Sequence, residues 1–533
     1  MDCYHDGLSG IFRYRQQIIA SLSWIDFFSF LWAQLHIPMK QSLLLLTAIA
    51  FAFSVNAQTQ GVAFPTVGKG VATPFVTDYH CLGINVSGLG WGTGYQGKRF
   101  TVGTAEFGFG IYSETLNSQK LRNLSKTLYN QATNRESSTI DYKQQLSAAG
   151  DYAESGVSVF LDFNWAGFAF QSEKFGGIAF NIRENYQYYS KLNKQTSDLI
   201  FRGKFSNYFD SLTVVFGADT STIANNGNIS NDTLEAVIQG NISVPLRLSE
   251  ITNGSSIKMV WSRSYNIGYG RKIIGNDSTF AIYGGIGARL IQSMAMFDLT
   301  SDGSGLSVSS SITPAFNIDY GNISGANVMN YKGGIPPAVG NGYGIDLAAS
   351  VIMFKNLRIA AAVNNIGSVT YSRNVYSVRD TLVGNFSLDG LNQENITQTV
   401  NQLLREGGIL TLEGKEKFKV MNAADFRLGA SLEMFKILRV GFDLVAPFNN
   451  ENPGSLQNAV FSFGGDVKPV KWLQLNAGYF GGGVYKSNIP VGVTFILKDG
   501  GYEFGIASRD ALSFFTKNAH SVSTAFGFAR FRF

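Results

Sequence analysis

The last thirteen residues, Ser521–Phe533 (SVSTAFGFARFRF), constrain the fold more than any other stretch of the chain. They alternate with a period of two, as a strand does. One face carries Phe533, Phe531, Ala529, Gly527 and Ala525, and the other carries Arg532, Arg530 and Phe528. Chain termini usually fray, so an aromatic strand without a polar tail needs a partner that holds it. A closed barrel provides one by pairing the last strand with an early one, and the alternative is the edge strand of a β-sandwich.

Composition favours the barrel. The chain has 59 glycines, 13% aromatic residues and only 15% charged residues, whereas globular proteins carry roughly 25% charged residues. Many glycines and aromatics, without a helix-length apolar run in the body of the chain, are typical of a β-barrel whose outer wall faces lipid. The formal net charge of +5 is small and dispersed, so it does not indicate a nucleic-acid partner.

The N-terminal region has the pattern of an export signal. Residues 39–57 combine Lys40, an apolar core over Leu43–Val55 and a small residue at Ala57, which predicts a signal peptide cleaved after Ala57. Residues 1–38 are then interpreted as a spurious upstream extension, with translation starting at Met39. The alternative is that Ile18–Ile37 forms a transmembrane helix.

Few residues of the exported chain suit metal binding or catalysis. Cys81 would be its single cysteine, so no internal disulfide can form. Only His80 and His520 follow the signal peptide, which disfavours histidine-based metal sites and catalysis. No catalytic, metal-binding or cofactor-binding residues are predicted, and the protein is expected not to be an enzyme.

Alternating strands of the length needed to cross a bilayer occupy most of residues 99–533. They are expected at Arg99–Ser113, Val157–Ala169, Ile178–Asn185, Ile257–Tyr269, Phe280–Ile291, within Leu306–Tyr320, Tyr343–Met353, Leu357–Asn365, Phe426–Met434, Leu438–Leu444, Leu473–Tyr479, Ile489–Leu497, Glu503–Arg509 and Ser521–Phe533. Short turns alternate with long loops. The prediction is an all-β, transmembrane antiparallel barrel of about 14 strands, with 12–16 as the range.

Three stretches depart from this rhythm. Residues 58–98 are glycine-rich and without a strand period, and they are expected to form a plug that includes Asp78, Asn85 and Trp91. Lys191–Thr252 and Arg379–Lys417 are expected to be insertions of loops and short helices.

The polar faces of the strands place charged residues in the barrel lumen. These are Asp346, Arg358, Arg427, Glu433, Arg439, Asp443, Glu503, Arg509, Arg530 and Arg532. Facing lipid, an arginine would cost about 2–4 kcal/mol at the bilayer midplane, so an inward orientation is expected. Acids and bases could then pair across strands and simply fill the lumen, or they could line a ligand or permeation path. Aromatic clusters such as Tyr186–Tyr189 suit interface girdles or a core equally.

Several phrases together resemble an uncharacterised family of Bacteroidetes outer-membrane barrels, the domain of unknown function 5723. They are TDYHCLGINVSGLGW (Thr77–Trp91), WSRSYNIGYGRKII (Trp261–Ile274), GNGYGIDLA (Gly340–Ala348), AAVNNIGSVTYSRNVY (Ala361–Tyr376) and GYEFGIASRDALSFFTK (Gly501–Lys517), and the closing FGFARFRF completes the set. The terminal Phe533 also resembles the assembly signal of outer-membrane barrels. The resemblance implies an outer-membrane barrel, distantly like the FadL-type barrels that pass hydrophobic molecules and the PorV-type barrels of a secretion system.

Three functional hypotheses follow. The first is a FadL-like barrel that passes or binds a hydrophobic or small ligand. The second is a PorV-like scaffold or secretion accessory, whose two insertions would bind a secretion or surface protein. The third, a barrel enzyme, is disfavoured because histidines are scarce and no G-x-S-x-G, H-E-x-x-H or P-loop motif stands in a suitable place. Outer-membrane lipid is the expected surrounding.

Overall fold

We describe a computed structural model of the chain, covering residues 63–92, 97–123, 142–226, 229–318, 320, 323–390, 410–435, 437–482 and 485–533. The predicted signal peptide (39–57), the upstream extension with the alternative helix Ile18–Ile37, and residues 58–62 lie outside these ranges. So do residues 391–409 of the second insertion. Within the described residues, no helix combines the length and the apolar character needed to cross a membrane.

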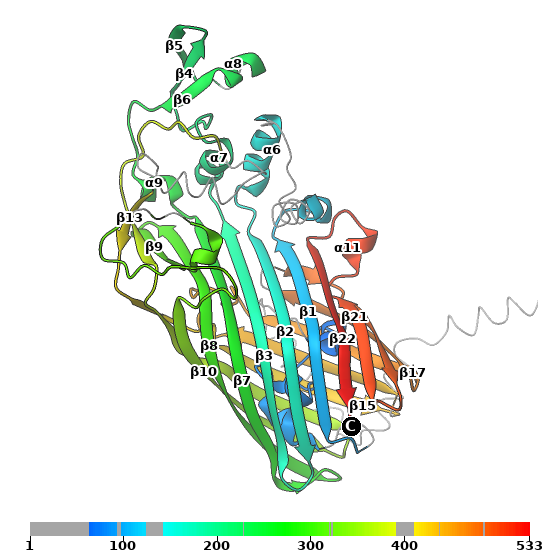
Figure 1. Ribbon diagram of the computed structural model, residues 1–533. Coiled ribbons are helices and arrows are strands. Elements are labelled where there is room, and N and C mark those ends of the chain that lie inside the picture. The colour runs from blue at the N-terminus through cyan, green and yellow to red at the C-terminus, as the bar shows by residue number, and fades with distance from the viewer. Residues whose placement is uncertain are drawn as a thin grey trace, which may run out of the picture. The chain divides into compact units, whose positions relative to one another are not determined.

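Fourteen antiparallel strands form a closed transmembrane barrel, as the sequence predicted (Figure 1). In ring order they are β1 (Phe100–Ser113), β2 (Val157–Ser172), β3 (Gly176–Lys191), β7 (Ser256–Asn276), β8 (Phe280–Asp302), β10 (Gly340–Met353), β11 (Leu357–Tyr371), β15 (Asp425–Met434), β16 (Leu438–Pro447), β17 (Val460–Val470), β18 (Leu473–Gly482), β20 (Val491–Leu497), β21 (Tyr502–Ser508) and β22 (Ser521–Arg532).

The terminal strand closes the ring. Strand β22 pairs with β1 from Thr101↔Arg532 to Tyr112↔Ser521, and with β21 on its other side. The carbonyl of Phe533 accepts hydrogen bonds from the backbone N–H groups of Arg99 and Phe100, at 2.8 and 3.2 Å. The chain end is therefore held by backbone pairing, and β22 is not the free edge of a sandwich.

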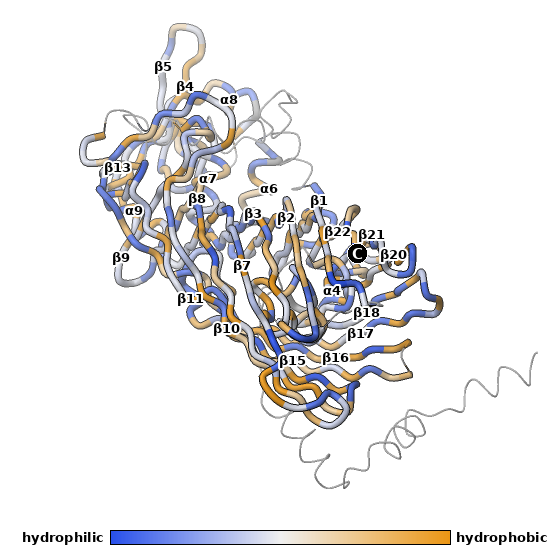
Figure 2. Tube along the Cα trace, turned by 60° about the horizontal axis from the view of Figure 1, so that its bottom comes forward, coloured by the Kyte–Doolittle hydropathy of each residue, from blue (hydrophilic) through white to orange (hydrophobic). Residues whose placement is uncertain are grey.

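Turns differ in length between the two ends of the barrel. At the end where β22 stops, neighbouring strands are joined by two to four residues. At the opposite end, which we call the long-loop end, the connections are longer and carry the remaining structure. Hydrophilic and hydrophobic residues alternate along the wall strands (Figure 2). Large apolar side chains such as Trp165, Ile286 and Ile506 are more than half exposed on the outer face, as a lipid-facing wall requires.

The sequence counted one strand that lies outside the ring and missed one that belongs to it, so the predicted total was unchanged. The stretch expected within Leu306–Tyr320 forms β9 (Gly305–Ile312), which pairs only with the outer part of β8 and with the short strand β12 (Val375–Arg379). Below it, β8 pairs directly with β10. The sequence missed the wall strand β17, whose Gly464, Gly465 and Pro469 weaken the strand pattern.

A β-bulge also changes which side chains of the terminal strand point into the barrel. The register between β21 and β22 shifts between Glu503↔Arg530 and Gly505↔Gly527. Gly527 therefore shares the inner face with Arg530, whereas Phe528 points outward and is 58% exposed. Strict alternation placed Gly527 on the face of Phe531 and Phe528 on the face of Arg530. The bulge inserts one extra residue into the strand and so exchanges the two faces, and the residue types in the sequence do not reveal it.

The two insertions of the sequence pack on each other at the long-loop end and form one cap. Its elements are α7 (Lys194–Arg202), β4 (Ser211–Phe216), β5 (Asp219–Ala224), α8 (Asn231–Glu235), β6 (Val237–Asn241) and α9 (Leu248–Thr252), with residues 379–390 of the second insertion. A buried cluster joins Tyr208 and Phe209 of the first insertion to Val383 and Phe386 of the second. The other elements outside the ring are α6 (Tyr142–Tyr152), η3 (Pro314–Phe316), β13 (Thr411–Gly414), β14 (Phe418–Met421), β19 (Tyr485–Asn488) and α11 (Leu512–Phe515).

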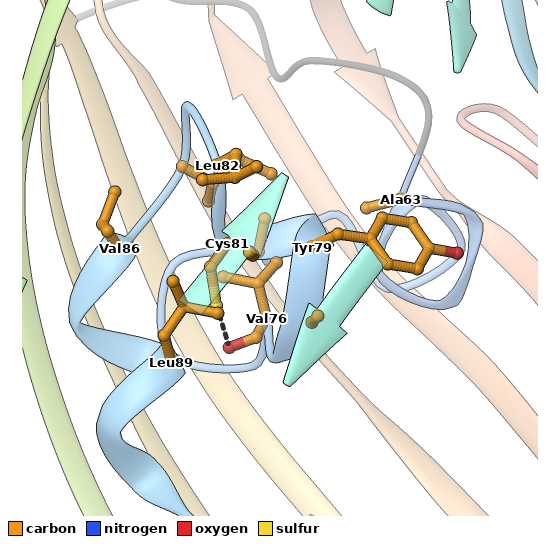
Figure 3. Packing of buried hydrophobic residues seen from close by; sticks show 11 residues of the cluster. Ala63, Val76, Tyr79, Cys81, Leu82, Val86 and Leu89 are labelled. Atoms are coloured by element: carbon orange, nitrogen blue, oxygen red, sulfur yellow. Dashed lines mark hydrogen bonds between the residues drawn. The ribbon is translucent and has the colours of Figure 1, made fainter. Parts of the chain in front are cut away.

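Residues 63–92, here called the inner segment, lie inside the ring. They form α4 (Phe64–Val67), η1 (Asp78–Cys81) and η2 (Val86–Trp91), and they are almost entirely buried. Helix α4 contacts β20, β21 and β22, whereas η2 contacts β3, β7, β8 and β10 on another part of the wall. The apolar side chains of the segment pack on themselves around Val76, Cys81 and Leu89, and the Cys81 thiol donates to the Val76 carbonyl at 3.4 Å (Figure 3).

Candidate functional site: the barrel lumen

Charged side chains of the wall hold the start of the inner segment. Lys69 forms a fully buried ion pair with Asp466, whose other oxygen accepts hydrogen bonds from Arg439 at 2.9 and 3.0 Å. One oxygen of Asp443 accepts the backbone N–H groups of Ala72 and Thr73, both at 3.0 Å. Arg439 and Asp443, which the sequence placed in the lumen, therefore both contact this part of the chain directly or through a shared carboxylate.

A second group of charges joins the inner segment to the terminal strand. Asp78 pairs with Arg530 and lies 3.5 Å from Arg532. Both arginines also pair with Glu503 of the neighbouring strand β21. Asp78 and Arg530 are 1% and 4% exposed, and a buried charge of this kind is tolerated only when it is paired. The four residues, all expected from the sequence, form one network.

Glu106 of β1 is at the centre of a third group of contacts between the wall and the inner segment. It is fully buried and accepts a hydrogen bond from the Tyr79 hydroxyl at 2.7 Å. It also lies 3.0 Å from His80 Nε2 and accepts from Asn164 Nδ2 at 2.8 Å. Tyr79 and His80 thus fix η1 against β1 and β2. His80 is held by a carboxylate of the wall. The described residues contain no group of three or more potential metal ligands.

The end of the inner segment is held by neutral hydrogen bonds. Asn85 Nδ2 donates to the Thr73 carbonyl at 2.8 Å, and its oxygen accepts from Ser87 at 2.6 Å. Trp91 Nε1 donates to the hydroxyl of Ser350 at 2.8 Å. The guanidinium of Arg358 lies 4.8 Å from the centre of the Trp91 ring, a cation–π geometry. Asn85 therefore acts within the segment, and Trp91 joins it to β10 and β11.

The other charged residues predicted for the lumen are not in the groups described above. They lie nearer the long-loop end, or beside wall strands other than those that hold Asp78 and Glu106. Asp346 pairs with Arg289 and accepts the backbone N–H of Asn365 at 2.7 Å. Arg427 pairs with Asp425 at 2.8 Å. Glu433 attracts Arg358 electrostatically, and the Arg509 guanidinium lies 4.3 Å from the centre of the Phe160 ring. These residues do not converge with Asp78 and Arg530 on a single site.

Inward-facing glycines give the inner segment its space. A Cβ placed on Gly464 or Gly478 would come within 2.0 and 2.2 Å of the Lys69 carbonyl oxygen. A Cβ on Gly103 or Gly167 would overlap the ring of Tyr79. Glycine in a strand often marks a close approach of another backbone or side chain. The high glycine content of the chain thus corresponds in part to the contact between wall and inner segment.

A cavity lies above the inner segment, with Leu82 at its boundary. The empty space among its lining residues amounts to about 1230 Å³, a figure that includes open solvent. Its polar lining includes Asp162, Arg183, Asn266, Arg289, Asp425 and Arg427, and its apolar lining includes Phe160, Val260, Ile291, Val369, Val420 and Leu456. A smaller cavity lies beside Tyr79 and His80 and shares Leu82 and Arg183 with the first; its empty space of about 280 Å³ also includes open solvent.

Sequence reasoning missed several of these residues. Asp162, Arg183, Arg289, Asp425 and Asp466 stand at inward positions of their strands, so the alternation that identified the others could have found them. Lys69 carries no such signal, because the inner segment has no period. At Glu106 the alternation of β1 breaks, because the preceding Ala105 has a positive φ of 54° and the buried face changes there. Chemically, the buried polar residues of the lumen can bind a ligand, exclude water and exchange hydrogen bonds.

Comparison with known proteins identifies the family. Solved structures to which the chain is similar include the Pseudomonas putida toluene transporter TodX (11% identity, 90% of this chain and 98% of that chain, TM-score 0.38) and the Ralstonia pickettii toluene transporter TbuX (11%, 89% and 98%, 0.40). A Pseudomonas aeruginosa FadL homologue is similar at 9% identity, over 89% and 99% of the two chains, with a TM-score of 0.37. No curated protein matches the sequence. Residues 210–499 match the model of a family of unknown function, DUF5723, and the chain belongs to that family.

Proposed function

We propose that the protein is an outer-membrane barrel that binds or passes a hydrophobic or small ligand through its lumen, in a FadL-like manner. The supporting observation is the cavity above the inner segment. The interior of a transmembrane barrel is usually polar, yet Val260, Ile291 and Val369 point into this one and are joined there by Val420 and Leu456. Apolar side chains around a lumen cavity suit a ligand with an apolar part.

In this proposal the inner segment is the plug, and Asp78, Asn85 and Trp91 help to hold it. Its contacts with the wall fill the lumen below Leu82. The smaller cavity beside His80 shares Leu82 and Arg183 with the larger one. A ligand would therefore enter from the long-loop end, reach the larger cavity and pass further only after a local rearrangement of the plug. Residues 39–57 direct export in this scheme, and the role is not enzymatic.

Reconstitution of the full chain tests the proposal. Purified barrel in liposomes is expected to bind a fluorescent hydrophobic probe and to speed the entry of small apolar solutes relative to empty liposomes. Ile291→Asn, which places a polar group in the cavity, is expected to weaken probe binding, whereas Ile291→Leu is expected to preserve it. A folded barrel that binds no hydrophobic probe and passes no small solute would contradict the proposal.

A second candidate function is a non-transporting scaffold or secretion accessory, as in PorV-type barrels. The cap favours it, because the two insertions form one packed body with a buried core and not separate loops. The Tyr208 hydroxyl donates to the Val383 carbonyl at 2.6 Å, and Lys204 pairs with Asp389 at 3.0 Å. Such a body could bind a secretion or surface protein. Pull-down from native membranes, with the full chain and with both insertions deleted, tests this role, and an unchanged set of partners would argue against it.

A further inference from the structure

Arginine side chains in the larger cavity have unused hydrogen-bond donors. Arg427 is 1% exposed, and its Nε and Nη2 face Asp425 at 2.8 and 3.5 Å. Its Nη1 is buried and has no hydrogen-bond partner among the described residues. Arg289 uses Nη2 for both oxygens of Asp346, and its Nε is likewise buried without a partner. A guanidinium carries five N–H donors, so one carboxylate leaves others unused.

The unused groups are donors and not acceptors. No buried carboxylate, amide or hydroxyl oxygen of the described residues lining the cavity lacks a partner, whereas Arg289 and Arg427 each present a buried N–H. Leaving such a donor unsatisfied costs about 1–3 kcal/mol, and more when it is charged. A neutral hydrocarbon in the cavity would leave both donors unsatisfied, so hydrophobic contact alone does not account for the lining.

The charges around the cavity do not by themselves favour an anion. The cavity is lined by Arg183, Arg289 and Arg427 and by two carboxylates, Asp162 and Asp425. Asp443 and Asp346, which are not part of the lining, also attract Arg427 electrostatically, and Asp346 pairs with Arg289. What an oxyanion would gain in this cavity is hydrogen bonds from the unused donors.

We propose that the larger cavity is an oxyanion site, in which Arg427 and Arg289 bind the acid group of the ligand. This deepens, and rests on, the proposed ligand-binding function. The apolar side chains Val260, Ile291 and Val420 line the same cavity and would contact the rest of an organic acid. The oxyanion could belong to such an acid or to a free inorganic anion, and a neutral molecule with acceptor oxygens is the competing occupant.

Three probes separate these cases. Calorimetric titration of the full-length barrel in nanodiscs uses benzoate as an organic acid, benzyl alcohol as its neutral counterpart and inorganic phosphate as a free oxyanion. Benzoate is expected to bind at least about tenfold more tightly than benzyl alcohol, since hydrogen bonds to charged groups are the stronger kind. Equal binding of phosphate and benzoate would assign the site to free oxyanions.

The variants remove a cation together with its own partner, so that no single buried charge remains. Arg427→Gln with Asp425→Asn is expected to abolish the preference for benzoate over benzyl alcohol. Arg289→Gln with Asp346→Asn is expected to do the same, and the asparagine can still accept the Asn365 N–H. The matched control is Arg263→Gln with Glu184→Gln, an ion pair of 2.8 Å. Arg263 alternates with the inward Ser262 and Ser264, and Glu184 with the inward Arg183 and Asn185, so both side chains face outward. A mobility shift on heating, in an electrophoresis gel, verifies folding of each variant.

The result that overturns the inference is equal binding of benzoate and benzyl alcohol that neither lumen variant changes. That outcome leaves the proposed ligand-binding function intact. Absence of binding for all three probes also overturns the oxyanion site. The hydrophobic-probe assay above then decides independently whether the proposed function survives.

Discussion

Arg530 of the last strand and Asp78 of the inner segment form a buried ion pair that joins the end of the chain to its beginning. Because Arg530 also pairs with Glu503 at 2.8 Å, closure of the ring and seating of the inner segment depend on the same guanidinium. The two ends of the described chain are therefore coupled inside the barrel, and loss of this one group should weaken both.

Arg530→Gln is expected to lower the stability of the folded barrel by about 3–5 kcal/mol, since it leaves Asp78 and Glu503 buried with less compensation. Urea unfolding in detergent, followed by the mobility shift on heating, measures this. The control Arg379→Gln removes an ion pair whose side chains are 62% and 37% exposed, and exposed pairs contribute about 0–1 kcal/mol. Equal effects of the two substitutions would show that the Asp78–Arg530 pair has no special role.

Gly464→Ala is expected to displace the inner segment, because the new methyl group would come within 2.0 Å of the Lys69 carbonyl oxygen. Overpacking of this kind costs about 1–3 kcal/mol. Limited proteolysis should then cut the inner segment faster than in the unaltered protein. Gly303→Ala is the control, since an added Cβ there meets nothing within 4 Å. Unchanged cleavage in the Gly464 variant would mean that the segment is not fixed by this contact.

The barrel could be predicted from the sequence because its strands repeat one local rule. Alternation placed Arg439, Asp443 and Glu503 on the inward faces of their strands. In the structure they bond to Asp466, to the inner segment and to Arg530, respectively. The rule fails at bulges, as at Phe528, and it says nothing about how far a strand is paired, which is why β9 was taken for a wall strand. The predicted number of wall strands was still right, because β17, which the sequence missed, belongs to the wall in place of β9.

Contacts between distant segments could not be predicted from these patterns. The inner segment has no period, so no local rule relates Lys69 to Asp466, which follows 397 positions later. The two insertions are joined through Tyr208 and Val383, 175 positions apart. The sequence identified both insertions but could not show that they pack into one cap. The cavity arginine Arg427 was expected in the lumen, whereas its unused donor became visible only with the positions of its neighbours.

Tyr208→Phe is expected to loosen the cap by about 1 kcal/mol, because the hydroxyl donates to the Val383 carbonyl and accepts the Leu246 N–H at 3.0 Å. Burial also raises the pKa of Tyr208 above its ordinary value of 10.0. The Tyr208 hydroxyl therefore contributes its full stabilisation of the cap below pH 10, and this stabilisation is lost as the pH rises through the pKa of the folded state. Hydrogen exchange of the cap measures both effects. Tyr331→Phe, which removes an exposed local hydrogen bond of 2.6 Å, should leave the cap unchanged, and an equal loss in both variants would refute the role of Tyr208.

Phe528→Arg tests which face of the terminal strand meets lipid. Phe528 is 58% exposed on the outer wall, so the substitution is expected to destabilise the barrel by about 2–4 kcal/mol if the residue lies near the bilayer centre, and by less towards the surface. Unfolding in lipid vesicles measures the cost. The control Phe216→Arg places the same charge on β4 of the cap, where the phenylalanine is 52% exposed, and it should have little effect because water solvates the charge there. A stable Phe528 variant, with unaltered insertion into vesicles, would mean that this position does not face lipid and that the bulge between Gly527 and Arg530 does not turn the strand.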